Sequence, residues 1–250
     1  MRYTSVMEQE TTHPTPKKSI STGAAIVTAA VIIGIAIVIA FGPKSASNGT
    51  PANNVQQPAE VTSVPADVAK IRQSDRIRGD AATAQVAVIE YSDSDCPYCA
   101  RFHTTMQDIV EEYNGKVAWV YRYFPLASLH PNATTEAVAL ECVADLGGND
   151  DFNKYLDILI NTTLNADPKS NETLTTFAMA QGIRDDLFTA CMKGTKAAAR
   201  VKADTEEAQK IGAQGTPFSI IVNLKSGKQA IVPGAYGIEE VKAKIDSVLR

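Results

Sequence analysis

Residues 96 to 99 read Cys-Pro-Tyr-Cys and hold two of the four cysteines in the chain. Two thiols at this spacing can form a permanent disulfide, supply half of a metal site, or open and close in thiol–disulfide exchange. The neighbouring sequence favours exchange. A β-branched run at 85–91, "QVAVIEY", predicts a buried strand before the pair, and the pattern at 97–113 predicts a helix after it.

This position between strand and helix predicts different properties for the two sulfurs. Because proline disfavours the α conformation of the residue before it, we expect Cys96 at the N-cap and Pro97 at the first helical position. Cys99 then lies one turn in, facing Cys96, so the sulfurs can form a disulfide without distorting the helix. Free backbone N–H groups and the positive helix end stabilise a thiolate on Cys96, whereas the more buried Cys99 is expected to stay protonated.

A metal site is one alternative for the pair. Structural zinc needs four ligands, which often come from two paired motifs. The remaining cysteines, Cys142 and Cys191, are isolated in the sequence, and we expect His103 and Phe102 to face the core or a helical block. We therefore predict no metal and no other cofactor. An inert disulfide, or a binding module with a vestigial disulfide, is the other alternative.

Composition limits the classes of protein. The chain has 250 residues, of which 44% are hydrophobic, which suits one globular domain with an appendage. Its net charge of −4 offers no basic footprint for nucleic acid, so that class is set aside.

An apolar segment at 20–41 predicts a membrane anchor. It contains no charge between Lys18 and Lys44, and as a helix it would be about 33 Å long, enough for a hydrocarbon core of about 30 Å. A cleaved signal peptide is the alternative, but its apolar region is shorter and ends in a small-residue site. Basic residues concentrate before the segment, so we expect residues 1–19 in the cytoplasm and the rest of the chain across the membrane.

A linker and one domain follow the anchor. Residues 42–66 are rich in proline and asparagine and predict a disordered tether, and residues 67–250 form the domain. The predicted fold class is an α/β sandwich with an all-helical insertion at about 128–212. Strands are predicted at 85–91, 116–124, 218–223 and 228–233, and helices at 97–113, 131–146, 150–163, 172–181, 184–193, 195–212 and 238–249.

Two runs of sequence carry a family resemblance. The runs are "VIEYSDSDCPYCARFH" at 88–103 and "GTPFSIIVN" at 215–223. Together they resemble the DsbA-like branch of the thioredoxin superfamily, whose members are extracytoplasmic thiol–disulfide oxidoreductases. The resemblance covers roughly residues 75–250. It implies a thioredoxin-like fold interrupted by a helical domain, which agrees with the predicted order of elements.

The resemblance also implies roles for individual residues. Cys96 matches the nucleophile and Cys99 the resolving cysteine, and Glu90 matches a buried glutamate that moves protons to and from the second cysteine. Independently, a carboxylate among apolar strand residues is unusual, and burial would raise its pKa; an exposed strand end is the alternative. The residues assigned to substrate binding are Pro97, Tyr98 and the two residues of a cis-proline loop, Thr216 and Pro217.

Two further features bear on redox chemistry. Cys142 and Cys191 could be buried free thiols, but outside the cytoplasm a structural disulfide is expected, and some DsbA-like relatives carry a second one. Asp93 and Asp95 lie close to Cys96, and their negative charge opposes a thiolate. We therefore expect a weaker oxidant than the strongest family members, and Asp95→Asn should lower the pKa of Cys96.

The predicted function is oxidation of thiols in exported polypeptides by a membrane-anchored, extracytoplasmic enzyme. The resemblance implies a membrane quinone-linked partner that reoxidises the pair. The alternative is a reductant or isomerase that uses the same site, since about 30 mV in reduction potential changes this two-electron equilibrium about tenfold.

Overall fold

The structure is a computed structural model that describes residues 61–166 and 169–250. The predicted tail at 1–19, the predicted anchor at 20–41 and most of the predicted linker at 42–66 lie outside the described residues. Within the described ranges, no helix has both the length and the apolar character needed to cross a membrane.

The described residues form one five-stranded sheet with the strand order β1-β3-β2-β4-β5. Strands β2 and β3 are parallel, and the other neighbouring pairs are antiparallel. Both β2 and β3 are buried along their full length, which explains their near-continuous apolar sequences. The strand bounds are β1 Arg76–Arg78, β2 Val86–Ser92, β3 Val117–Tyr123, β4 Phe218–Asn223 and β5 Gln229–Val232.

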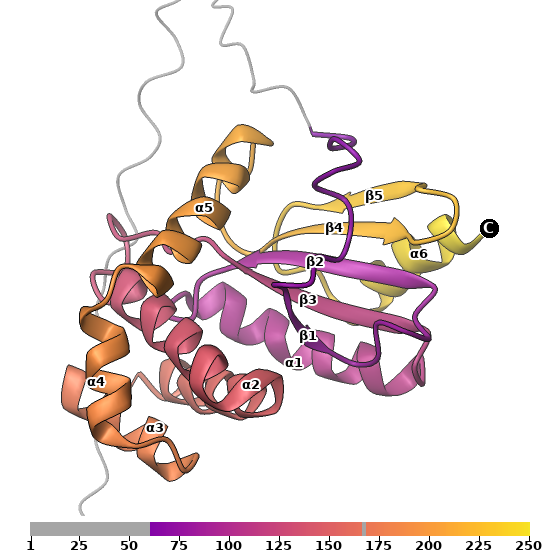
Figure 1. The fold of residues 1–250 in the computed structure, drawn as a ribbon. Helices are drawn as coiled ribbons and strands as arrows, with labels where there is room; N and C mark the ends of the chain where they lie inside the picture. The colour runs from indigo at the N-terminus through magenta and orange to yellow at the C-terminus, as the bar shows by residue number, and fades with distance from the viewer. Residues whose placement is uncertain (1–60, 167–168) are drawn as a thin grey trace, which may run out of the picture. The chain divides into compact units, whose positions relative to one another are not determined.

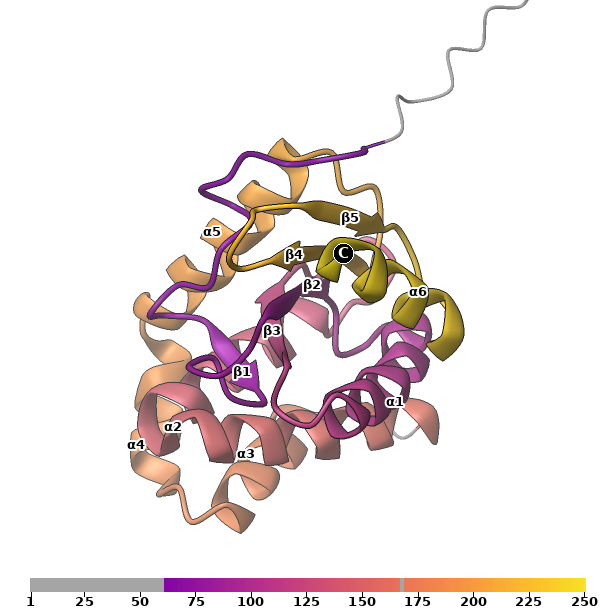
Figure 2. The ribbon, with the colours of Figure 1, turned by 90° about the vertical axis from the view of Figure 1, so that its right-hand side faces the viewer.

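Helices cover both faces of the sheet (Figures 1 and 2). On one face lie α1 (Pro97–Glu112) and α6 (Ile238–Leu249), which contact each other and the sheet. Helix α5 (Lys196–Lys210) packs on β3 from the opposite face, together with residues 64–69. The core between the sheet and the first pair of helices includes Val88, Phe102, Met106, Ile221 and Ile245. The sheet is therefore covered on both sides, as an α/β sandwich requires.

Within the described residues, four helices stand between β3 and β4: α2 (Ala133–Leu164), α3 (Asn171–Ala180), α4 (Asp185–Lys193) and α5. They share a second core that includes Leu140, Phe152, Leu174, Phe188 and Val201. Helix α2 is interrupted at Gly148, where φ is 84° and ψ is −171°. It therefore corresponds to the two helices predicted at 131–146 and 150–163.

Two features near the start of the domain differ from the sequence-based expectation. Arg76–Arg78 forms the edge strand β1, because it pairs with β3 even though two arginines in three residues carry no strand pattern. Val64 lies within the predicted linker, yet it is buried and its backbone exchanges hydrogen bonds with the Gln229 side chain. The packed domain therefore begins before residue 67.

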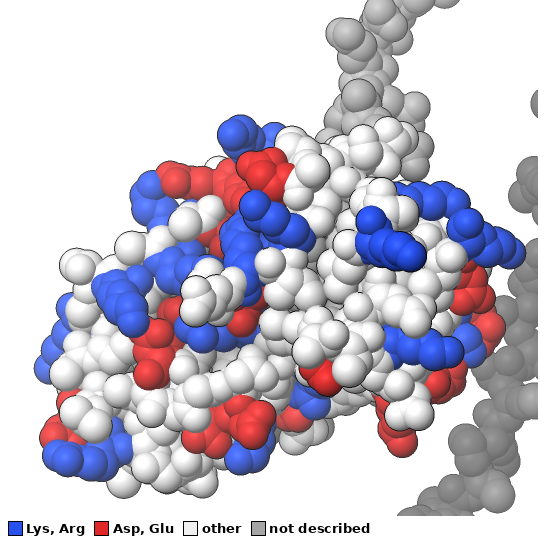
Figure 3. Space-filling view, turned by 45° about the vertical axis from the view of Figure 1, so that its right-hand side comes forward, with Lys and Arg blue, Asp and Glu red and all other residues white. Residues whose placement is uncertain are grey.

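Charged side chains of both signs share the surface of the domain. On the face drawn in Figure 3, lysine and arginine side chains lie beside aspartate and glutamate side chains, with uncharged surface between them. This mixture agrees with the small net charge of −4.

Candidate active site: the cysteine pair at the start of helix α1

Cys96 and Cys99 lie where β2 ends and α1 begins, and both are free thiols. Cys96 is the N-cap, with an extended backbone (φ −85°, ψ 121°), and Pro97 is the first helical residue, so both predictions of local structure are confirmed. The two cysteines are buried, whereas Pro97 and Tyr98 between them are exposed, Tyr98 to 58%. The motif therefore meets solvent through its central dipeptide.

The surroundings of Cys96 favour its ionised form. Its pKa is lowered to about 5, chiefly by the hydrogen bond from the Cys99 thiol, with the backbone N–H groups of Cys99 and Tyr98 contributing against the effect of burial. These N–H groups are available because the first turn of a helix has no intrahelical acceptors for them. Burial, followed by the hydrogen bond to Cys96, raises the pKa of Cys99. One sulfur is thus held as a thiolate and the other as a thiol, which is the arrangement that exchange uses.

Glu90 lies on β2, the strand that leads to the cysteine pair, and is almost fully buried. Burial raises its pKa to about 7, although hydrogen bonds with Ser92 and Trp119 act to lower it. The Trp119 indole N–H donates to Glu90 Oε2 at 2.8 Å. The Glu90 charge is also among the causes that raise the pKa of Cys99. A carboxyl that titrates near neutrality beside the second thiol is suited to exchange protons with it.

The loop before β4 brings two residues remote in the sequence to the cysteine pair. The Thr216-Pro217 peptide bond is cis. The Cys96 sulfur lies 3.7 Å from the carbonyl oxygen of Thr216. The residues predicted to bind substrate are therefore placed together, with Pro217 buried and Thr216 partly exposed beside the nucleophile.

The two acidic residues before Cys96 have partners that oppose their negative charge. Asp93 Oδ2 lies 2.8 Å from His130 Nδ1 and accepts a hydrogen bond from the backbone of Leu126. Partial burial acts to lower the pKa of His130, but the hydrogen bond with Asp93 and the negative charges of Asp93, Cys96 and Asp95 together outweigh it, so the pKa is raised. Asp95 Oδ1 lies 3.0 Å from Lys169 Nζ. The negative charge expected beside the thiolate is therefore partly compensated.

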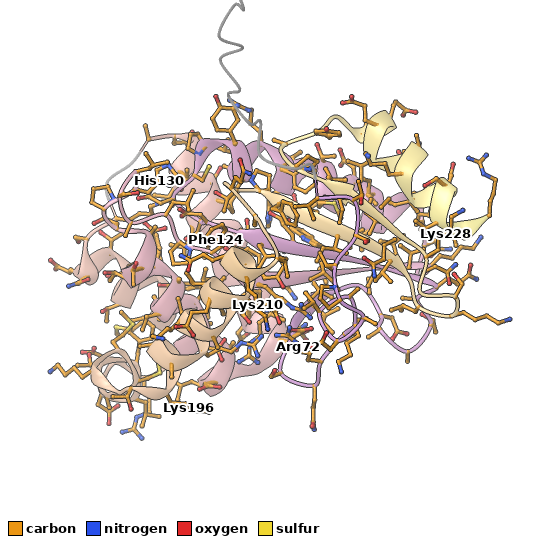
Figure 4. All side chains as sticks on the ribbon, turned by 90° about the horizontal axis from the view of Figure 1, so that it is seen from above. Arg72, Phe124, His130, Lys196, Lys210 and Lys228 are labelled. Atoms are coloured by element: carbon orange, nitrogen blue, oxygen red, sulfur yellow. A yellow bond between two sulfur atoms is a disulfide. The ribbon has the colours of Figure 1, made fainter. Side chains whose placement is uncertain are left out.

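Figure 4 shows the place of His130 in the domain: it lies with Phe124 toward one end, and Lys228 of the turn between β4 and β5 lies toward the other. His130 immediately precedes the helix predicted at 131–146, and α2 begins at Ala133. The contact of His130 with Asp93 depends on the path of the loop between β3 and α2.

Sequence reasoning also missed Trp119. The available signal was its position in the strand predicted at 116–124, which in the structure pairs with the strand of Glu90. Phe102 and His103 are buried, as expected for side chains facing the core. His103 Nε2 lies 2.7 Å from Asp157 Oδ1, and its ring contacts Trp119 edge-on with 4.8 Å between ring centroids. His103 therefore packs behind the Trp119 ring, which itself contacts Glu90.

Comparison with known families agrees with this geometry. The family model described as thioredoxin matches residues 72–246. The chain belongs to the thioredoxin family. Among curated proteins, this thioredoxin-family chain is 29% identical over 173 residues to the Na(+)/H(+) antiporter NhaA 3 of Salinispora tropica. The match covers 69% of the chain but 24% of the antiporter, so the chain spans about a quarter of that relative.

Solved structures establish the type of thioredoxin fold. α-DsbA1 of Wolbachia pipientis superposes with a TM-score of 0.63 at 21% identity, covering 73% of this chain and 94% of that one. DsbA2 of Pseudomonas aeruginosa gives 0.59 at 21% identity, covering 71% and 96%. The expected fold, thioredoxin-like with a helical insertion, is therefore confirmed. Together with the family model, the superpositions confirm the expected thioredoxin superfamily and a fold shared with DsbA proteins.

Proposed function

We propose that the chain oxidises thiols of exported polypeptides as a membrane-anchored enzyme whose catalytic domain lies outside the cytoplasm. The observation that carries the proposal is the stabilised thiolate of Cys96, whose pKa is lowered to about 5. A protein that stabilises this thiolate stabilises the reduced pair, and its disulfide is a stronger oxidant for that reason.

The proposed reaction starts from the Cys96–Cys99 disulfide. A substrate thiolate attacks the Cys96 sulfur, the bond to Cys99 breaks, and the Cys99 thiolate takes a proton from Glu90. A second substrate thiolate then attacks the substrate sulfur of the mixed disulfide, and Cys96 leaves as its thiolate. The substrate loses two electrons and the enzyme gains them. Pro97, Tyr98, Thr216 and Pro217 are the proposed contacts to the substrate.

The proposed location rests on two observations. A disulfide joins Cys142 to Cys191, and structural disulfides persist outside the cytoplasm but are rare within it. The apolar segment at 20–41, preceded by basic residues, supports an anchor with the domain at 67–250 on the far side of the membrane. A membrane quinone-linked partner is the proposed reoxidant, on the family resemblance alone.

The test is the equilibrium of the cysteine pair with glutathione, combined with catalysed oxidation of a reduced substrate protein. We expect a potential above about −200 mV and net formation of disulfides. Cys96→Ser should abolish activity, whereas the matched double variant Cys142→Ala/Cys191→Ala should retain it. A potential near about −270 mV would instead indicate a reductant. Rearrangement of scrambled disulfides without net oxidation would indicate an isomerase.

A further inference from the structure

A buried lysine of the helical insertion contacts the loop that carries the nucleophile. The side chain of Lys169 is 2% exposed, and its Nζ lies 3.0 Å from Asp95 Oδ1 and 3.1 Å from Glu136 Oε1. It also donates a hydrogen bond to Thr163 Oγ1. Asp95 precedes Cys96, while Glu136 and Thr163 lie in the first and last turns of α2. Lys169 therefore joins the active-site loop to both ends of one helix of the insertion.

The same two residues of α2 hold the loop directly. Ser94 Oγ donates to Glu136 Oε2 at 2.8 Å, and Thr163 Oγ1 donates to the Ser94 carbonyl at 2.7 Å. Glu136 and Ser94 are buried. A nearly buried lysine is rare unless it is paired, because removing its charge from water is unfavourable without a counter-charge. The Lys169 ammonium therefore holds Asp95 of the active-site loop against Glu136 and Thr163 of α2.

The position of Asp95 gives this contact a redox consequence. A carboxylate next to a thiolate disfavours the thiolate, and a cation bound to that carboxylate offsets the effect. The same loop also carries Asp93, whose carboxylate pairs with His130 at 2.8 Å. Burial raises the pKa of Glu136 and the Lys169 charge lowers it, so the lysine influences that carboxyl as well.

We propose that Lys169 is a positioning residue for thiol–disulfide exchange: it neutralises Asp95 beside Cys96 and fastens the active-site loop to the helical insertion, so that the cysteine disulfide remains oxidising. The proposal deepens the proposed function and rests on it for the direction of the reaction. Lys169 lowers the pKa of Cys96 and makes the disulfide more oxidising whether the enzyme oxidises or reduces its substrates.

The test replaces Lys169 by methionine, which has similar length and no charge. In Lys169→Met we expect the pH midpoint of Cys96 alkylation to rise by about one unit, which corresponds to a tenfold weaker thiolate. At neutral pH the equilibrium constant for reduction of the disulfide by glutathione should fall about tenfold. The reduction potential of the cysteine pair should therefore fall by about 30 mV. Lys169→Arg should keep both values near those of the wild type. Adding Asp95→Asn to Lys169→Met should restore them.

Lys196→Met is the matched control, because Lys196 is 84% exposed and pairs with Asp145 instead of the active-site loop. Lys169→Gln is measured in parallel, since its amide can hydrogen-bond to Thr163 without charge and so supports folding. Unchanged alkylation and glutathione equilibria in both Lys169 variants, or no restoration by Asp95→Asn, would overturn the proposal. A wild-type potential near that of thioredoxin would overturn the oxidase function only, and the shift caused by Lys169→Met would still be measurable.

Discussion

Trp119 of β3 donates its indole N–H to the carboxyl of Glu90 on the neighbouring strand β2, with 2.8 Å between Nε1 and Oε2. Both side chains are buried. The strand register places Tyr121 opposite Glu90, so Trp119 is the diagonal neighbour on the same face. Because the chain contains one tryptophan, its intrinsic tryptophan fluorescence reports on this contact.

The first prediction concerns Glu90 itself. We expect the rate at which Cys99 resolves a mixed disulfide on Cys96 to increase with pH, with a midpoint near 7, because the Glu90 pKa is raised to about 7 by burial and the carboxylate is the form that accepts the proton of Cys99. In Glu90→Gln this midpoint should disappear and the rate at neutral pH should fall about 100-fold. Stopped-flow measurement over a pH series tests this. The exposed Glu111→Gln is the matched control, and a midpoint that survives in Glu90→Gln contradicts the assignment.

The second prediction concerns the hydrogen bond from Trp119. Trp119→Phe keeps an aromatic ring and removes the N–H that stabilises the ionised Glu90. A hydrogen bond to a charged group contributes about 1.5–3 kcal/mol, so the midpoint of the resolution rate should move upward by about one to two pH units. In the wild type, tryptophan fluorescence should titrate with the same midpoint near 7, and Glu90→Gln should abolish that transition. A midpoint that stays in place or moves downward in Trp119→Phe would exclude this role.

The third prediction concerns the disulfide between Cys142 of α2 and Cys191 of α4, which are separated by 49 positions. Removing it as Cys142→Ala/Cys191→Ala should reduce the free energy of unfolding by about 2–4 kcal/mol, because the unfolded chain gains conformational freedom. Urea unfolding of the oxidised protein measures this. Each single alanine variant should show a similar loss. Unaltered stability in the double variant would mean that packing of the insertion alone holds these helices together.

The fourth prediction concerns the buried arginine of β3. Arg122 is fully buried, and its guanidinium pairs with Asp75 Oδ2 at 3.0 Å and donates to the carbonyl oxygens of Val68 and Lys70. Arg122→Met removes the fully buried partner of Asp75, whose remaining cationic contact is Arg200 Nη2 at 3.2 Å from Oδ1. We therefore expect a loss of about 3–5 kcal/mol in the free energy of unfolding, with part of it recovered when Asp75→Asn is added.

An exposed ion pair provides the control for Arg122. The side chains of Arg184 and Asp186 are 71% and 62% exposed, and exposed pairs contribute about 0–1 kcal/mol. Arg184→Met should therefore leave urea unfolding almost unchanged. Equal effects of Arg122→Met and Arg184→Met would show that the buried pair does not support the attachment of residues 68–75 to the sheet.

The local structure of the site could be predicted because it depends on neighbouring residues. The proline at 97 restricts Cys96 to an extended backbone and starts α1, so the N-cap position follows from two adjacent residues. The apolar runs of β2 and β3 are long enough to indicate strands buried on both faces. Gly148 interrupts α2 between the two helices predicted at 131–146 and 150–163. Strand β1 could not be found in this way, because pairing with β3 decides its conformation and its own residues do not.

The sequence by itself determined the type of chemistry and the local geometry of the cysteine pair, because helix starts and strand periodicity depend on contiguous residues. Only the tertiary structure decided what surrounds that pair. It places Thr216 against Cys96, Trp119 against Glu90 and Lys169 against Asp95. Hydrogen bonds and ion pairs act over a few ångströms in space, whatever the separation along the chain. The negative charge that the sequence places beside the nucleophile is therefore paired, in the folded domain, with a lysine from the helical insertion.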